Sequence, residues 1–241
     1  MNYHSVHPTH HNATTPDDFE TQMEYLKSEF TVISLVDFQT LRQSDSDLPD
    51  KVAVITFDDG YEDNYQYAFP ILKKLELPAT IFVSTAYIDG DVDITQRYFT
   101  YRGLTPLTWD QIREMKQSRI SFGGHTDSHQ ILSEILIDDA KREIILSKSK
   151  LEARLGEPVT HFAYPLGQPW TFNPAIIDIL RESGFSLSCA TIWGSDNSHT
   201  DMFALHRIRI DAVDTVMDFK NKVLGKWDFT SIFQTIKARW S

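Results

Sequence analysis

The sequence contains a single cysteine, Cys189, so no disulfide can form within the chain. It has no run of about 18 apolar residues, the length that a transmembrane helix needs. Its opening residues, MNYHSVHPTHH, lack the charged and apolar regions of a secretory signal. Basic residues are the minority, because 23 Lys and Arg stand against 34 Asp and Glu and leave a formal net charge of −11. We therefore expect a cytoplasmic protein that is not a general binder of nucleic acid or of anionic membrane surfaces.

No internal repeat, low-complexity tract or long linker interrupts the 241 residues. Short apolar runs typical of strands alternate with longer segments of helical periodicity. The expected strands are residues 31–36, 51–57, 79–84, 119–123, 160–164, 185–191 and 204–210, and the expected helices start at Pro16 and Thr108 or span residues 61–75, 138–155 and 174–183. This alternation predicts a parallel α/β fold, either an open doubly wound sheet or a closed barrel, with the site in loops after the strands.

Three of the expected strands end in segments that can support chemistry. "ITFDDG" places Asp58 and Asp59 directly after a buried strand, although Asp-Gly alone is also common in turns. "GGHTDSH" places His125 and His129 four residues apart, where both could face a metal ion or both could lie on the surface. The zinc proteases share this spacing, but Thr126 occupies the position of their catalytic Glu. "THFAYPLGQPW" runs from a strand into a Pro- and Gly-rich loop that can present backbone N–H groups to an oxyanion.

In this order and at these distances, TFDDG, HTDSH and FAYPLG closely resemble the motifs of the polysaccharide deacetylase family, the carbohydrate esterases that share the NodB homology domain. The resemblance covers nearly the whole chain. It implies a single α/β domain over residues 1–241, folded as a distorted (β/α)7 barrel. It also implies a bound divalent metal and the removal of N-acetyl, sometimes O-acetyl, groups from sugars.

The resemblance assigns roles to the residues of these motifs. Asp59, His125 and His129 would hold a divalent metal, most simply Zn²⁺, with Co²⁺ and Ni²⁺ as alternatives. Asp58, which is free of the metal, would be the general base that takes a proton from water. The backbone N–H of Leu166 would join the metal in stabilising the tetrahedral oxyanion.

The sequence departs from the common family pattern in two places. Many relatives carry an Arg in the third motif that orients the catalytic Asp, whereas this position holds Ala163. Arg207 or Arg209 of the segment "LHRIRI" could take over this supporting role, or both could be surface charges. The usual late motif, an apolar strand that ends in Leu-x-His, is also missing as such, and His206 is the nearest downstream substitute.

The opening segment offers a second candidate for the general acid. In the branch that includes the poly-N-acetylglucosamine deacetylases, the barrel is circularly permuted. The histidine that acts as general acid then comes from an early "YHxV/I" segment. Tyr3-His4-Ser5-Val6 matches this segment, so we expect His4 to protonate the departing amine, with His206 as the alternative. The other histidines of this region, which we expect in a solvated loop, are His7, His10 and His11.

The residues expected to contact a sugar come from the loops that follow the strands, although aromatic residues there often serve packing alone. They are Tyr164, Pro165, Trp170 and Trp193, with Tyr101, Asp196 and Asn197 as weaker candidates.

The expected function is that of a metal-dependent hydrolase that removes N-acetyl groups from N-acetylhexosamine units of a polysaccharide or a glycan precursor. Its expected partner is therefore a carbohydrate and not a nucleic acid. Three alternatives remain open: a deformylase or O-deacetylase with the same site, a catalytically inactive carbohydrate-binding domain, and a metal-binding regulator that uses only the His-rich start.

Overall fold

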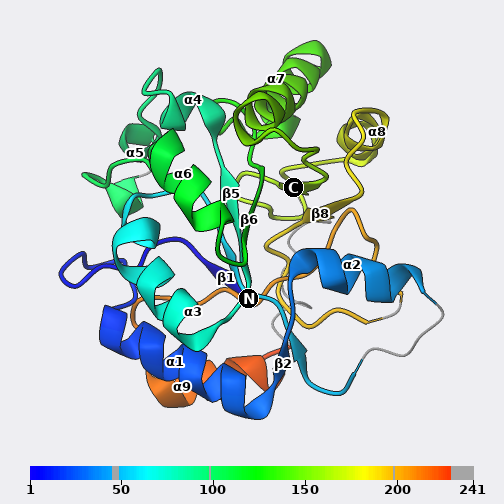
Figure 1. Ribbon diagram of the computed structural model, residues 1–241. Helices are drawn as coiled ribbons and strands as arrows, with labels where there is room; N and C mark the ends of the chain where they lie inside the picture. Colours follow the sequence, from blue (N-terminus) through cyan, green and yellow to red (C-terminus); the bar gives the residue numbers. More distant parts are fainter. Residues whose placement is uncertain (45–48, 98, 198, 229–241) are drawn as a thin grey trace.

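The computed structural model describes residues 1–44, 49–97, 99–197 and 199–228. The expectation of one domain over residues 1–241 thus includes residues 229–241, which lie outside the described residues. Six parallel strands form the main sheet in the order β1-β4-β5-β6-β7-β8, and β2 pairs with β3 in a second, smaller sheet (Figure 1). The strands are β1 Asn2–Tyr3, β2 Thr31–Val32, β3 Val52–Ala53, β4 Thr56–Phe57, β5 Ala79–Val83, β6 Ile120–Gly124, β7 His161–Ala163 and β8 Leu187–Cys189.

Residues 205–210, here called the closing segment, lie between the two edge strands of the main sheet. Leu205 forms a parallel bridge with Cys189 of β8, and Arg209 forms one with Asn2 of β1. The backbone N–H of Asn2 donates to Ile208 at 2.8 Å, which continues this pairing. The closing segment therefore takes the seventh place around a curled parallel sheet. The expectation of a distorted (β/α)7 barrel is confirmed.

Helices cover the outside of this sheet (Figure 1). They are α1 Pro16–Glu29, α2 Leu35–Gln43, the π-helix η1 Asn64–Ala68, α3 Phe69–Leu75, α4 Thr85–Ile88, α5 Ile94–Arg97, the 3-10 helix η2 Phe99–Tyr101, α6 Trp109–Lys116, the 3-10 helix η3 Leu132–Glu134, α7 Ile137–Leu155, α8 Pro174–Glu182 and α9 Val216–Val223. The start signals in the sequence are confirmed, because Thr15 caps α1 with Pro16 in its first turn, and Thr108 forms a capping box with Gln111.

Three expected strands differ from the structure, and the one predicted for residues 204–210 forms only isolated bridges. The strand predicted for residues 31–36 ends at Val32, because the Ser34 hydroxyl accepts a bond from Asp37 N–H and the Asp37 carboxylate accepts one from Ser34 N–H. This capping box starts α2 in the middle of the apolar run. The strand predicted for residues 51–57 is divided into β3, which pairs with β2, and β4, which enters the barrel.

Side chains that alternate along the strands separate two apolar clusters. Tyr3 and Phe57 point outward and pack against Phe19 of α1, in the large cluster between sheet and helices. The smaller cluster contains residues of the barrel interior together with two of α2: Phe82, Ala163, Leu187, Cys189, Leu205, Leu35 and Phe38. The polar residues predicted to form the site follow the carboxyl ends of β1, β4, β6 and β7.

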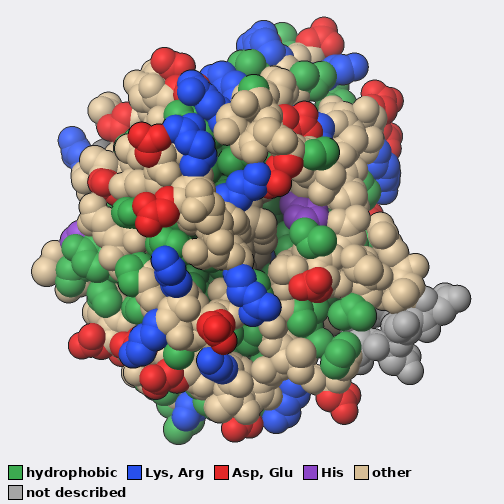
Figure 2. Space-filling model, viewed as in Figure 1, with side chains coloured by type: hydrophobic (Ala, Val, Ile, Leu, Met, Phe, Trp, Pro, Cys, Tyr) green, Lys and Arg blue, Asp and Glu red, His purple; other side chains and the backbone are tan. Residues whose placement is uncertain are grey.

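The surface carries both signs of charge. On the face shown in Figure 2, Lys and Arg side chains are interspersed with Asp and Glu. Among the helices of the described residues, none has both the length and the apolar character that crossing a membrane requires.

Candidate active site

Three residues converge after β4 and β6: Asp59, His125 and His129, here called the metal-ligand group after their predicted role. Nε2 of His129 lies 3.0 Å from Oδ1 of Asp59, and Nε2 of His125 lies 3.4 Å from the same oxygen. All three residues are at least 95% buried, with 5% exposure for Asp59, 1% for His125 and 4% for His129. The expectation that these residues come together is confirmed, and one ligand atom from each lies within 4.8 Å of the others.

The backbone of this group is held in conformations that L-residues rarely adopt. Asp59 has φ of 75° and His129 has φ of 57°, both in the left-handed region. The turn between the two histidines is fixed by Glu143 of α7, whose carboxylate accepts bonds from the Ser128 N–H and hydroxyl, each at 2.7 Å. Such strain persists only where the surroundings enforce it, which is typical of functional sites.

The donor atoms of the metal-ligand group suit a divalent ion. Nδ1 of His125 contacts the Ala163 carbonyl at 2.8 Å, so this nitrogen carries the proton and Nε2 presents its lone pair. Oδ1 of Asp59 is buried and has no partner with hydrogen-bond geometry in the described part of the chain. Two ligand atoms about 2.1 Å from a tetrahedral ion lie about 3.4 Å apart, close to the separations seen here. The buried Asp-His-His group could therefore bind a metal.

The charges of the group favour ionised Asp59. Burial alone would raise the pKa of Asp59, but His129 and His125 lower it well below its ordinary value. For His125, burial lowers the pKa, yet the contacts with Asp59 and Asp58 raise it above its usual value. A carboxylate and two imidazoles at these positions supply the oxygen and nitrogen ligands that zinc-like ions prefer.

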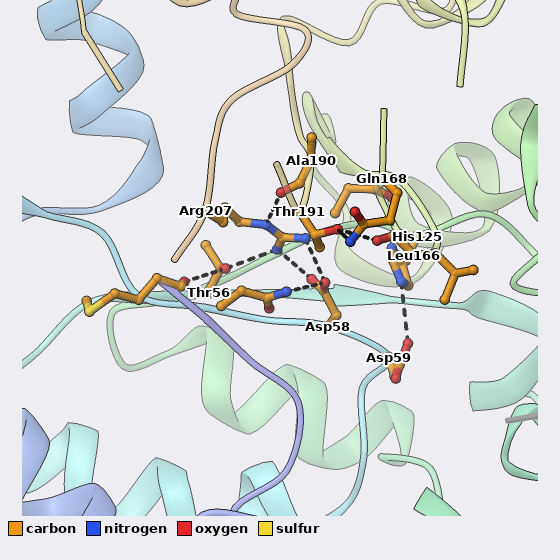
Figure 3. A network of polar contacts seen from close by, with 12 residues as sticks. Thr56, Asp58, Asp59, His125, Leu166, Gln168, Ala190, Thr191 and Arg207 are labelled. Atoms are coloured by element: carbon orange, nitrogen blue, oxygen red, sulfur yellow. Dashed lines mark hydrogen bonds and ion pairs between the residues drawn. The ribbon is translucent and has the colours of Figure 1, made fainter. Parts of the chain in front are cut away.

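Asp58 lies beside this group but is bound from the opposite side (Figure 3). Arg207 donates from its two terminal nitrogens to both carboxylate oxygens of Asp58, each at 2.7 Å. Asn2 adds a third bond to Asp58 at 3.0 Å. Although burial opposes ionisation, the charges of Arg207 and His125 hold the pKa of Asp58 below its ordinary value.

The two arginines of the closing segment differ in position. Arg207 is 4% exposed, and it is itself anchored by the Ala190 carbonyl at 2.8 Å and the Thr56 hydroxyl at 3.1 Å (Figure 3). Arg209 instead forms an ion pair with Asp211 at 2.7 Å and is largely exposed. Of the two candidates to replace the Arg that the third motif lacks at Ala163, the structure places Arg207 on Asp58.

His4 follows β1 directly, two residues after Asn2, whose side chain binds Asp58. Burial lowers the pKa of His4 below its usual value, and the nearby charges of Asp59 and Asp58 counter part of this effect. Its ring stacks on Tyr101, with 5.4 Å between centroids and 14° between planes. Its carbonyl accepts a bond from the Asn64 side chain at 2.9 Å.

His206 lies elsewhere. It lines a cavity of about 610 Å³ together with Met1, Phe38 and Asp196. Its backbone N–H donates to Asp196 at 2.9 Å. Because Met1 precedes β1 and residues 52–54 of the same lining precede β4, this cavity lies toward the amino ends of those strands, whereas His4 and Asp58 follow their carboxyl ends.

The third motif forms a tight turn next to His125. Leu166 has φ of 59° and is 42% exposed, and its carbonyl accepts a bond from the Thr191 hydroxyl (Figure 3). Gly167 has φ of 60°, and a Cβ there would lie 2.7 Å from the Thr191 nitrogen, so only glycine fits. Pro165 is buried, and the buried Tyr164 donates its hydroxyl to the Phe203 carbonyl at 2.9 Å. The ring of Tyr164 is thus engaged in the core.

The remaining candidates for sugar contacts are spread over several loops. The Trp170 carbonyl accepts a bond from Ser133 at 2.9 Å, while the Trp193 ring lies 6.4 Å from that of Trp227 and beneath Lys222. Asp196 accepts the bond from His206 described above, and Asn197 accepts one from Arg42 at 2.7 Å. Their roles toward a sugar stay predictions.

The histidine loop after β1 is partly ordered by its own contacts. His11 is exposed, as expected for a solvated loop. His7 and His10 are half-buried, and Nδ1 of His7 accepts the His10 N–H at 3.0 Å. His10 stacks on His11 at 5.0 Å and on Tyr101 at 6.1 Å.

Beyond these contacts, more than half of the sequence matches a known family. The family described as Polysaccharide deacetylase matches residues 45–188. The chain belongs to the polysaccharide deacetylase family.

Similar proteins agree with this membership. The Bacillus subtilis (strain 168) protein named "Putative polysaccharide deacetylase YxkH" is 28% identical over 86% of this chain and 69% of its own length. The poly-beta-1,6-N-acetyl-D-glucosamine N-deacetylase of Staphylococcus aureus (strain MRSA252) is 25% identical over 78% of this chain and 65% of its own, so the chain spans just under two thirds of that enzyme. The solved structure of Streptococcus pyogenes deacetylase PplD in complex with acetate has a TM-score of 0.79, at 26% identity, over 92% of this chain and 96% of that one.

Three contacts of this polysaccharide deacetylase were missed by sequence reasoning. Asn2 binds Asp58, Asn64 holds the backbone of His4, and Tyr61 lies beside Asp59, where burial and then the Asp59 carboxylate raise its pKa. The Asn2 contact was within reach, since strand alternation places residues 2 and 4 on the same face. The other two depend on how η1 and its preceding turn pack, which no local pattern shows.

Proposed function

We propose that this protein is a metal-dependent deacetylase that removes N-acetyl groups from N-acetylhexosamine units of a polysaccharide or a glycan precursor. The observation that carries the proposal is the position of Asp58. It is held by Arg207 and Asn2 next to the metal-ligand group, and His4 lies close to both carboxylates. One site thus contains a base, an acid and a place for an electrophilic ion.

Asp59, His125 and His129 are the residues that would hold the ion. A divalent ion such as Zn²⁺ would polarise the acetyl carbonyl and lower the pKa of a water molecule to about 7. Three protein ligands leave room for water and substrate, as in catalytic zinc sites.

Asp58 would take the proton from the attacking water. Because its pKa is lowered, it is ionised at neutral pH and ready to accept that proton. The bidentate pair with Arg207 fixes the plane of the carboxylate, so its lone pairs keep one direction during the reaction.

His4 would donate a proton to the departing amine, and the backbone N–H of Leu166 would stabilise the oxyanion. His4 suits this role because an imidazole changes charge near neutral pH and because it lies beside both acids. The left-handed turn at Leu166 and Gly167 is anchored to Thr191, which gives the loop a fixed backbone conformation.

The substrate class is supported by the relatives. The Staphylococcus aureus enzyme is named for poly-beta-1,6-N-acetyl-D-glucosamine, and the similarity to it extends over 78% of this chain. We therefore propose β-1,6-linked N-acetylglucosamine oligomers as the first substrate to test.

The test is the release of acetate from these oligomers by the purified protein. We expect the release to stop on chelation, to return on addition of Zn²⁺, and to be lost in Asp58→Asn. Asp17→Asn, on the exposed start of α1, is the control and should retain full activity. Acetate release that survives both chelation and Asp58→Asn would refute the mechanism. Release of formate from the matching N-formyl oligomers, with no acetate from the N-acetyl ones, would identify a deformylase.

A further inference from the structure

We propose that Tyr101 is a positioning residue that holds the imidazole of His4 against the metal-ligand group, an inference that rests on the proposed function of the site. Tyr101 belongs to η2. Along the chain it is more than forty residues from Asp59 and nearly a hundred from His4. Its position there follows from contacts that tie two distant segments together.

The ring of Tyr101 contacts both halves of the site. On one side it stacks on His4, with centroids 5.4 Å apart and planes only 14° from parallel. It also lies 5.3 Å from the ring of Tyr61, which is the neighbour of Asp59 described above. Tyr101 therefore links the proposed general acid to the residue that contacts a metal ligand.

The chain around Tyr101 is tied to the turn that carries Asp59. The backbone N–H of Glu62 donates to the Thr105 carbonyl at 2.8 Å, and that of Leu107 donates to the Gly60 carbonyl at 2.9 Å. The Tyr87 hydroxyl adds a bond to the Leu104 carbonyl at 2.9 Å. These bonds hold the segment that follows Tyr101 against the turn that carries Asp59.

The histidine loop also contacts η2, the helix that contains Tyr101. The Asn12 side chain donates to the Thr100 carbonyl at 2.6 Å, and His10 stacks on Tyr101 with 6.1 Å between centroids. The His-rich opening of the chain thus has a structural role beyond His4, because it packs against η2 and supports the position of Tyr101 on the His4 ring.

A general acid must stay within hydrogen-bond reach of the leaving nitrogen. His4 follows the end of a two-residue strand, and its backbone is fixed through the Asn64 bond to its carbonyl. The Asn64 bond fixes the backbone of His4 but does not restrict its side-chain torsions. The stacked ring of Tyr101 restricts the rotation of the imidazole about these torsions. A displacement of about 1 Å in a catalytic group can reduce turnover a hundredfold, so the restriction matters for kcat.

The experiment compares Tyr101→Leu, Tyr101→Phe and Tyr67→Leu. Tyr67 is the matched control, because its ring contacts His7 of the same loop at 5.5 Å and not His4. We expect Tyr101→Leu to lower kcat about tenfold to a hundredfold with KM and Zn²⁺ affinity unchanged. Tyr101→Phe, which keeps the ring, and Tyr67→Leu should both retain kcat within about twofold.

A second measurement does not depend on turnover. In NMR spectra, the ring protons of His4, assigned by their loss in His4→Gln, should change shift in Tyr101→Leu and not in Tyr67→Leu. If the wild-type protein releases no acetate, the proposed function fails while these spectra still test the contact. If the wild type is active, the positioning role is overturned by a Tyr101→Leu variant with normal kcat, by a raised KM alone, or by an equal loss in Tyr67→Leu.

Discussion

The β1 segment, residues 2–6, and the closing segment, residues 205–210, are neighbours in the barrel and yet serve the site differently. Each contributes one side chain that donates to Asp58, Asn2 with one bond from the first and Arg207 with two bonds from the second. Each also carries a histidine that the sequence offers as general acid. The β1 segment places His4 beside the acidic pair, whereas the closing segment turns His206 toward the cavity at the amino ends of the strands.

The alternation of side chains along β1 explains the position of His4. His4 is two residues from Asn2 and shares its face, so the residue that reaches Asp58 predicts where His4 points. His206 instead lines the cavity toward the amino ends of the strands, and its backbone N–H donates to Asp196.

The largest effect is expected from removing the arginine that the closing segment supplies. Arg207→Met would leave Asp58 buried without its charged partner, so we expect a loss of stability of about 3–5 kcal/mol and loss of detectable turnover. Arg209→Met removes an exposed pair with Asp211 and should change stability by less than about 1 kcal/mol. Denaturant unfolding and acetate release measure both. Equal effects of the two substitutions would show that Arg207 has no special role toward Asp58.

The two histidines test the comparison directly. We expect His4→Gln to lower kcat about 10²- to 10⁴-fold, because a positioned general acid is lost. His206→Gln should leave kcat unchanged, because this side chain lines the cavity away from the acidic pair. Steady-state kinetics on the same oligomers decide the matter. The reverse result, normal turnover in His4→Gln and none in His206→Gln, would assign the general acid to the closing segment.

Much of the fold was predictable because it depends on local patterns. The helix from Pro16 and the helix from Thr108 begin where their caps predicted, since capping bonds join residues three positions apart. The strand predicted for residues 31–36 was wrong because a local capping signal was overlooked. Ser34 and Asp37 form a capping box inside the apolar run and start α2 there. The closing segment was predicted as a strand, but only isolated bridges form there, at Leu205 and Arg209.

In the site, too, contacts within local motifs could be predicted, and contacts between distant segments could not. The roles of Asp59, His125 and His129 were assigned from the resemblance to the polysaccharide deacetylase motifs, and the structure brings the three residues together after β4 and β6. The choice between Arg207 and Arg209 could not be made, since residues two apart can share a face, and which of them reaches Asp58 depends on how the closing segment is placed between β8 and β1. The contact between Tyr101 and His4 joins segments nearly a hundred residues apart and has no signal in either.

The smallest expected effect concerns how the two segments are anchored at different pH. The Ser5 hydroxyl of the β1 segment donates to Asp63, whose pKa is raised by burial from 3.8 to about 7. The folded state therefore binds a proton more tightly than the unfolded chain. The stability that Asp63 contributes is complete below the ordinary pKa and is lost as the pH rises through 7. The pair between Arg207 and Asp58 has the opposite dependence, since the lowered pKa of Asp58 means that its contribution is lost as the pH falls.

Asp63→Asn isolates the first anchor, because an amide oxygen can still accept the Ser5 bond and carries no charge. We expect its stability relative to the wild type to improve by about 2 kcal/mol between about pH 5 and about pH 7. Urea unfolding of both proteins across this range, with chelator present so that metal binding does not contribute, measures the difference. A difference that stays constant would mean that Asp63 is ionised throughout, and that the β1 segment and the closing segment are both anchored by charge.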